Sequence, residues 1–278
     1  MTDGSDLAWL GLERRGEGRW SFELTPPLSR MDGKLYGGTG IAVSVAAMEA
    51  ETARDAVWVT TQFAGSADIG ERIDLHVEPL AVGRRTTQVR ITATVGDRVV
   101  LATVGATAAH RDSPVEAQMG SMPAVPGPSE AEPWGSRWRP AGADFEMPKV
   151  GWLLIAEMKQ VELGGERFAV WARMLDGRPQ TRSTLAFLAD MVPSSVARAA
   201  GHMGGGTSLD NAMRFGKLAP TEWILLDFDP WFAAGGYLHG GARVWAEDGT
   251  LLGYANQTAT AMVWTGQSPP WLEQQQQS

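Results

Sequence analysis

The amino-acid sequence predicts an α+β protein built from two similar units. Two groups of segments alternate apolar and polar residues, as half-buried antiparallel strands do. Each group also contains one stretch that favours a helix, and a proline-rich segment separates the two groups. The order strand, helix, then long strands therefore occurs twice, which indicates a duplicated α+β unit.

The first unit is predicted to span residues 1–110. The segment Tyr36–Ala53 reads YGGTGIAVSVAAMEAETA, and its alanines favour a helix packed on apolar neighbours. Gly96-Asp97-Arg98 separates two strands and predicts a hairpin turn. The strands expected in this unit are Arg19–Leu24, Arg72–Leu80, Thr86–Val95 and Val99–Ala109.

A linker is predicted over residues 111–148. Prolines recur there among glycine, serine and glutamate. Because proline donates no backbone hydrogen bond and restrains the residue before it, this composition suits an extended crossing segment.

The second unit is predicted to span residues 149–266. Ser183–Ala200 predicts a helical stretch interrupted near Pro193, and Asp248-Gly249 predicts a hairpin. The glutamine-rich residues 267–278 are expected to form a disordered tail. The strands expected in this unit are Glu166–Met174, Glu222–Phe228, Leu238–Ala246 and Thr250–Trp264.

Gln257 is a polar residue on an otherwise apolar strand face. In LLGYANQTATAMVW, residues 251–264, the odd positions carry only leucine, glycine, alanine and valine besides this glutamine. Laying GDRVVLATVGATA over DGTLLGYANQTAT aligns turn with turn and places Gln257 opposite Gly105. A purely structural need would predict similar residues in both copies, so the asymmetry indicates a function. Hydrogen bonding of Gln257 to a neighbouring strand end is the alternative.

Composition narrows the class of protein. The chain has 278 residues, of which 44% are hydrophobic and 20% charged, as in soluble globular proteins. It lacks both a signal peptide and the roughly 18 consecutive apolar residues of a spanning helix, so we expect a cytoplasmic protein without membrane insertion. The absence of cysteine excludes disulfides and thiolate nucleophiles. A net charge of -8 without a basic block argues against a nucleic-acid partner.

Common catalytic and cofactor motifs are absent. The sequence has no Gly-x-Ser-x-Gly elbow, H-E-x-x-H pair, Walker loop or dinucleotide fingerprint. The four histidines are scattered without partners at ligand spacing, so neither a metal site nor a cofactor is expected. They are His76, His110, His202 and His239.

Asp190 lies in the apolar run TLAFLADMVPSS. At helical spacing it shares a face with Ala186 and Phe187, which places it near the core. A carboxylate there costs several kcal/mol unless it is paired, hydrogen-bonded or protonated. Asp190 is therefore a candidate base or a buried structural acid, and rotation to solvent near Pro193 is the alternative.

Ser208 follows the glycine run in HMGGGTSLD. This segment follows a helix rather than a strand, so we interpret it as a flexible connection and not as a phosphate loop. Serine beside such a run is often part of a turn or a helix cap. Ser208 becomes a candidate site residue only together with Asp190 and Gln257.

The order and spacing of these segments resemble the bacterial acyl-CoA thioesterase II (TesB-like) family over nearly the whole chain. YGGTGIAVSVAAME resembles the first helix of that family, and AVWAR resembles the tryptophan-bearing strand of its second half. LAFLAD, TSLDNAMRF and DGTLLGYANQ resemble its three catalytic segments.

The resemblance implies a double hot-dog fold, in which two long helices are each wrapped by an antiparallel sheet. It also implies further association into a dimer, and hydrolysis of acyl-coenzyme A to a free acid and coenzyme A without a cofactor. The catalytic set of the family is an Asp, a Thr or Ser, and a Gln that hold one water. By motif these residues are Asp190, Ser208 and Gln257.

Departures from the family pattern keep other functions open. Asn211 stands where the family has histidine, and Arg214 stands where it has a bulky aromatic residue. These changes motivate an alternative, a non-catalytic acyl-CoA or lipid-binding protein with the same fold. A hot-dog hydratase or dehydratase is less consistent with the sequence, because those reactions generally require a histidine partnered with an acid.

Overall fold

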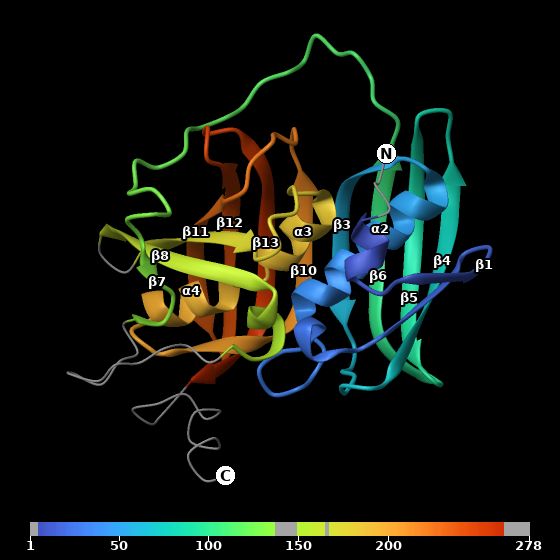
Figure 1. The fold of residues 1–278 in the computed structure, drawn as a ribbon, viewed down its shortest axis with the longest axis horizontal. Coiled ribbons are helices and arrows are strands. Elements are labelled where there is room, and N and C mark those ends of the chain that lie inside the picture. Colours follow the sequence, from blue (N-terminus) through green and yellow to red (C-terminus); the bar gives the residue numbers. More distant parts are fainter. Residues whose placement is uncertain (1–4, 137–148, 165–166, 264–278) are drawn as a thin grey trace.

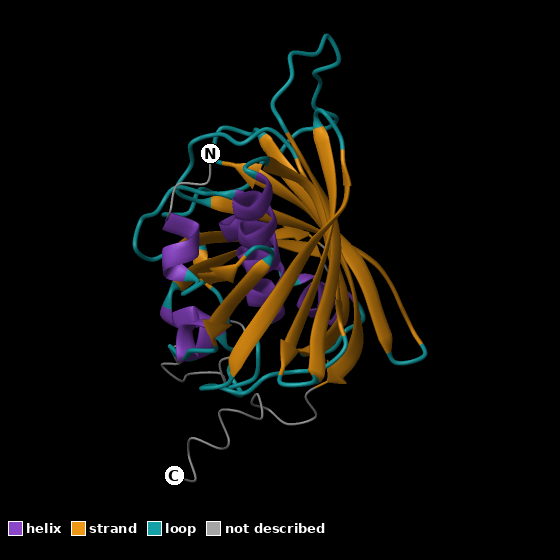
Figure 2. Cartoon of the chain, turned by 90° about the vertical axis from the view of Figure 1, so that its right-hand side faces the viewer, coloured by secondary structure: helices purple, strands orange, loops and turns teal. Residues whose placement is uncertain are grey.

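The main feature of the structure is one curved antiparallel sheet of thirteen strands. The structure, a computed structural model, describes residues 5–136, 149–164 and 167–263. Figures 1 and 2 show the sheet bending around the helices. The strands are β1 (Glu13–Gly16), β2 (Arg19–Glu23), β3 (Asp55–Phe63), β4 (Arg72–Val82), β5 (Thr86–Val95), β6 (Arg98–Ala108), β7 (Glu132–Pro133), β8 (Ala156–Gly164), β9 (Arg167–Met174), β10 (Gly204–Phe215), β11 (Ile224–Ala234), β12 (Tyr237–Ala246) and β13 (Leu251–Val263).

The helices lie together on the concave face of this sheet (Figure 2). In the described part of the chain, none is long and apolar enough to cross a membrane. They are α1 (Ser5–Trp9), α2 (Gly37–Thr52), α3 (Arg182–Leu188) and α4 (Val192–Ala199), with short 3-10 helices at Pro26–Leu28 and Gly151–Leu154.

The strand order repeats in the two halves of the sheet. The first half runs β2-β4-β5-β6-β3, and the second half runs β10-β13-β12-β11-β9. Each half thus consists of a strand, a helical segment and four further strands, the last of which returns beside the strand after the helix. The halves join through β3 and β10, which pair antiparallel with Val59 opposite Met213.

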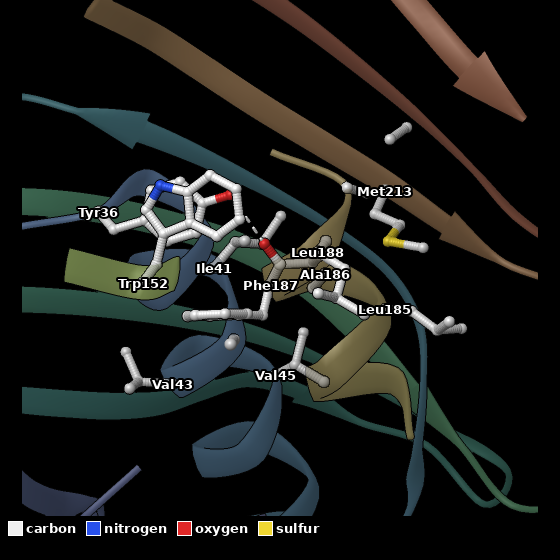
Figure 3. Packing of buried hydrophobic residues seen from close by; sticks show 14 of the residues in the cluster. Tyr36, Ile41, Val43, Val45, Trp152, Leu185, Ala186, Phe187, Leu188 and Met213 are labelled. Carbon is white, nitrogen blue, oxygen red and sulfur yellow. Dashed lines mark hydrogen bonds between the residues drawn. The ribbon is translucent and has the colours of Figure 1, made fainter. Parts of the chain in front are cut away.

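Helix α2 is buried along most of its length. Every side chain from Gly38 to Glu49 is buried, which explains the alanine-rich composition that predicted this helix. Phe187 of α3 packs edge-on against Tyr36 at the start of α2, with the ring centroids 5.1 Å apart. Figure 3 shows these rings beside Ile41 and Trp152, with the hydrogen bond from the Tyr36 hydroxyl to the Phe187 carbonyl dashed.

The second helical stretch is broken into α3 and α4. Proline lacks an N–H and its ring clashes with the carbonyl four residues earlier, so Pro193 cannot continue a helix through Ala189. Helix α3 therefore ends at Leu188, and α4 begins at Val192 with Pro193 in its first turn, where proline is tolerated. The interruption predicted near Pro193 is confirmed, and the segment that it leaves between the helices contains Asp190.

The glycine-rich segment before Ser208 is a strand, and its interpretation as a flexible connection was wrong. Gly204–Gly206 open β10 and pair with the end of β13. A Cβ on Gly206 would lie 2.6 Å from the Ala259 Cβ and 3.2 Å from the Pro193 Cβ. Glycine is required here because α4 and β13 approach the backbone too closely for a side chain.

The strand assignments for the other long segments are largely confirmed, with shifted ends. Strands β3 and β8 were not predicted. The described residues of the 111–148 segment cross the outer face of the second half, where the Trp171 indole donates to the Pro126 carbonyl at 2.9 Å. Residues 137–148 and the tail predicted at 267–278 lie outside the described residues.

Candidate active site

A cavity of about 720 Å³ opens between the start of α2, the break between α3 and α4, and the start of β10. Asp190, Ser208 and Gly37 line it together with aromatic and methionine side chains from both halves of the chain. Tyr36 and Trp152 form part of its wall and stack on each other with their centroids 5.2 Å apart. The cations at its rim are each paired, Arg30 with Asp32 and Lys34 with Asp68.

Asp190 lies in the break between α3 and α4 and faces the first turn of α2. Its Oδ1 accepts a hydrogen bond from Asn211 Nδ2 at 2.9 Å and another from Gln257 Nε2. The backbone N–H of Gly38 also donates to its carboxylate. The helix break, rather than a continuous helical face, therefore places Asp190 toward the cavity.

The protonation of Asp190 is set mainly by burial. Removal from water raises the pKa of its carboxyl to about 7, because the charged form loses hydration. Hydrogen bonds from Asn211, Gly38 and Gln257, and the positive charge of Arg30, oppose this rise. The result is a carboxyl that can exchange a proton near neutral pH.

Gln257 connects Asp190 with Ser208 and with helix α4. Its Nε2 donates to Ser208 Oγ at 3.2 Å as well as to Asp190, and its Oε1 accepts from the Val192 N–H at 3.1 Å. The side chain is 2% exposed, on the buried face that the alternation of β13 predicted. Its hydrogen bonds lead to the interhelical break and to Ser208 rather than to a strand end.

A β-bulge at Leu209 brings Ser208 to the same face as Asn211. Ser208 pairs with Ala259 and Asp210 with Thr258, so Leu209 is an extra residue in β10. Leu209 is partly exposed and lies among the residues that line the cavity. After the bulge Asn211 points inward, although in a regular strand it would face away from Ser208.

Two contributors to the site were not predicted from the sequence. Asn211 was noted as a departure from the family pattern, but only the bulge directs it at Asp190. Gly37 was predicted only as part of the helix in Tyr36–Ala53. A Cβ on Gly37 would lie 2.5 Å from Asp190 Oδ2, so glycine is needed to seat the carboxylate against α2.

The structure thus brings together the three residues that the sequence singled out. Asp190, Gln257 and Ser208 form a hydrogen-bonded chain from the α3–α4 break to β10. Among the described residues, no group of three or more His, Asp or Glu side chains is arranged as a metal site.

Comparison of the fold with solved structures finds similar chains over most of their lengths. A candidate thioesterase from Novosphingobium aromaticivorans is 26% identical, with a TM-score of 0.80, covering 90% of this chain and 98% of that one. A hot-dog protein of unknown function from Alicyclobacillus acidocaldarius is 20% identical, with a TM-score of 0.77 and coverage of 94% and 99%. An acyl-CoA thioesterase II from Mycobacterium marinum is 18% identical, with a TM-score of 0.72 and coverage of 94% and 99%.

Comparison of the sequence with family models gives two adjoining matches. Residues 24–109 match the acyl-CoA thioesterase N-terminal domain, and residues 109–261 match the acyl-CoA thioesterase C-terminal domain. A comparison with curated proteins gave no significant match. The two family models together cover residues 24–261, which include most of the sheet and every residue of the hydrogen-bonded chain described above, and the protein therefore belongs to the acyl-CoA thioesterase family of enzymes.

Proposed function

We propose that this protein hydrolyses the thioester of acyl-coenzyme A by direct attack of a water molecule activated by Asp190. The observation that carries the proposal is the hydrogen-bonded chain of Asp190, Gln257 and Ser208, in which Asp190 and Ser208 line the cavity. A carboxyl whose pKa is about 7 suits a general base at neutral pH.

The reaction balances with one water and one proton transfer in each direction. Asp190 takes a proton from water as the water oxygen bonds to the thioester carbonyl carbon. The carbon–sulfur bond then breaks, and Asp190 returns the proton to the departing coenzyme A thiolate. The products are the free acid and coenzyme A, and Asp190 regains its charge.

Ser208 holds the water in position, and Gln257 orients both Ser208 and Asp190. Because Gln257 is fixed at its other end by Val192, its Nε2 hydrogens have a defined direction. Ser208 Oγ accepts one of them and retains its own hydroxyl proton for a water beside Asp190. This arrangement contributes orientation, which lowers the entropic part of the barrier.

The first turn of α2 is suited to polarise the carbonyl. N–H groups in the first helical turn lack partners within the helix, and the helix dipole favours negative charge there. The Gly38 N–H is engaged by Asp190, whereas Gly37 lines the cavity one residue earlier. We assign the Gly37 N–H to the developing oxyanion.

We further propose that the two halves of the sheet are the two hot-dog units of a double hot-dog fold. The repeated strand order, with a helical segment on each half, supports this assignment. Association into a homodimer is proposed from the family resemblance, and sedimentation of the purified chain would test it.

The decisive experiment measures coenzyme A release from a chain-length series of acyl-CoAs. We expect Asp190→Asn to lower kcat by about 10²–10⁴-fold, the range typical of a lost general base. Gln257→Ala should lower kcat by a smaller factor. Asn256→Ala, on the outer face of the same strand, is the matched control and should retain activity.

Two outcomes would contradict the proposed function. Wild-type turnover in folded Asp190→Asn and Gln257→Ala would remove both residues from the mechanism. Acyl-CoA binding without turnover in the wild type would favour the non-catalytic binding protein. The absence of cysteine from the chain gives thiol detection no background from the protein.

A further inference from the structure

Asn211 is a side chain outside the proposed trio that donates a hydrogen bond to the Asp190 carboxylate. It is 1% exposed, and its Nδ2 lies 2.9 Å from Asp190 Oδ1. In the sheet it pairs with Gln257 of β13 on one side and with Thr61 of β3 on the other. Its backbone position is therefore fixed by two strands, one from each half of the molecule.

Both side-chain donors to Asp190 meet at one oxygen. Asn211 and Gln257 donate to Oδ1, while Oδ2 lies against Gly37 at the cavity wall. In the described part of the chain no side chain donates to Oδ2. The Gly38 N–H also donates to the carboxylate, but the two amides at Oδ1 fix its rotation and leave a lone pair of Oδ2 for the reacting water.

We propose that Asn211 is a positioning residue, an uncharged donor that holds Asp190 Oδ1 so that Oδ2 acts as the base. This inference rests on the proposed function, in which Asp190 accepts the proton. An amide is suited to the role because it donates at every pH and brings no charge to the carboxylate.

The charged and titratable groups around Asp190 are few. Tyr36 at the start of α2 donates its hydroxyl to the carbonyls of Phe187 and Asp190, at 3.1 and 3.3 Å. Arg30 and Lys34 at the cavity rim are paired with Asp32 and Asp68, respectively. On β10, the Asp210 carboxylate accepts from the Thr258 N–H. Neither amide donor to the Asp190 side chain titrates.

Variants at position 211 should shift the pH dependence in opposite directions. Asn211→Leu removes the donor at similar volume, so the acid limb of kcat/KM should move to higher pH. Asn211→Asp adds a second carboxyl and should move the limb higher still. Asn211→His supplies a donor that can become cationic, so it should move the acid limb to lower pH. Part of the limb could then lie below the pH range that is measured.

The expected effect on turnover is a fall in kcat of about 10–100-fold in Asn211→Leu, with KM changed less than about threefold, because orientation is lost and binding is not. Asn211→His should recover part of that loss. The matched control is Asn256→Leu, which makes the same chemical change on the outer face of β13. Carbon-13 NMR titration of the aspartates, with the signal assigned by Asp190→Asn, reads the Asp190 pKa without turnover.

The outcomes separate this inference from the proposed function. If Asp190→Asn is inactive but folded Asn211→Leu keeps the wild-type kcat and acid limb, the role of Asn211 is overturned and the mechanism stands. If Asn211→Leu, Asn211→Asp and Asn211→His lose activity equally and the pKa of Asp190 is unshifted in each, Asn211 has a structural role alone. If Asp190→Asn is active, the mechanism itself fails. A shift of the Asp190 pKa in the Asn211 variants, measured by NMR, would then show only that the two side chains are in contact. Should Asn211→Leu not fold, the opposed shifts of Asn211→Asp and Asn211→His decide the question.

Discussion

Gln257 donates a hydrogen bond to Asp190 across 67 residues of chain, from the one polar position on the buried face of β13. The same amide carbonyl accepts from the first N–H of α4. Gln257 therefore spans the break between α3 and α4 and holds the Asp190 carboxylate that the break turns toward the cavity. The break between α3 and α4 and the glutamine of β13 belong to one arrangement, because a continuous helix would leave no room for the Gln257 side chain.

The pH dependence of kcat/KM should show an acid limb centred near pH 7. Asp190 must be ionised to accept a proton, and burial raises its pKa to about 7. Activity should therefore rise with pH through that value and level off above it. Initial rates of coenzyme A release between pH 5 and pH 9 measure the limb. Circular dichroism at each pH controls for unfolding, and a limb centred near pH 4 would contradict a buried base.

Gly37→Ala should abolish most activity without unfolding the protein. The added Cβ would lie 2.5 Å from Asp190 Oδ2 and force the carboxylate away from its donors. Misplacement of a reacting group by about 1 Å can cost roughly 10²-fold in rate, whereas alanine in a first helical turn is well tolerated. Steady-state kinetics and thermal melts measure the two effects.

Gly127→Ala is the matched control for that substitution. Gly127 lies in the segment between the two halves, and a Cβ there would meet no atom within 4 Å. Its kinetics should equal those of the wild type. Wild-type kinetics in Gly37→Ala as well would show that Asp190 is not confined by α2.

Glu49→Gln should make the free energy of unfolding less sensitive to pH. Burial near the end of α2 raises the pKa of Glu49 to about 7, although the Ala56 N–H donates to it at 2.7 Å and Arg182 lies 3.8 Å away. In the unfolded chain this carboxyl ionises near its ordinary value of 4.5. Between the two values only the unfolded state releases the proton, so the free energy of unfolding falls as pH rises.

The amide variant removes this penalty. Relative to the wild type, its free energy of unfolding should rise by roughly 1–3 kcal/mol between pH 5 and pH 8. Urea denaturation at both pH values measures the difference. Glu17→Gln, at an exposed carboxyl, is the control and should show a much smaller change. A constant difference between Glu49→Gln and wild type would mean that Glu49 is ionised throughout.

Local patterns in the sequence predict much of the fold and part of the site. The alternation of side chains between the two faces of a strand was enough to find β13. The same alternation marked Gln257 as the exception on its buried face. The matched Gly105 also has a structural reason. A Cβ there would lie 2.9 Å from the Met48 Cε, since α2 is unbroken and packs directly on β6. The first half therefore has no room for the amide that the second half carries.

Other parts of the site depend on contacts that no local pattern records. Three glycines hid the start of β10, because residues without side chains show no alternation. Asn211 would face the wrong side in a regular strand, and only the pairing with β13 shows the bulge that turns it inward. The need for glycine at position 37 comes from Asp190, which is 153 residues away in the sequence.

Deletion of Leu209 should remove the bulge but keep Ser208 and Asn211 on one face. Without the extra residue they stand two positions apart, so a regular strand places both side chains on the inner face. The local bend and twist of the bulge would be lost, so we expect kcat to fall through misorientation of Ser208, with KM little changed. Leu209→Ala keeps the bulge and shortens a partly exposed side chain at the cavity, so it should lower kcat less than the deletion. Comparison of the two by kinetics and thermal melting tests the bulge itself.

Asp210 gives an independent test of the same bulge. Its Oδ1 accepts from the Thr258 N–H at 2.7 Å, and Thr258 directly follows Gln257. Asp210→Ala would leave that N–H without this partner and should cost about 1–3 kcal/mol of stability. Asp210→Asn keeps an acceptor oxygen and should stay close to the wild type in stability.

The same substitution should affect turnover. Because the bulge holds Ser208 opposite the Gln257 amide, Asp210→Ala should also lower kcat about tenfold, through lost orientation, with KM little changed. Equal turnover in both Asp210 variants would show that the strand pairing alone maintains the bulge.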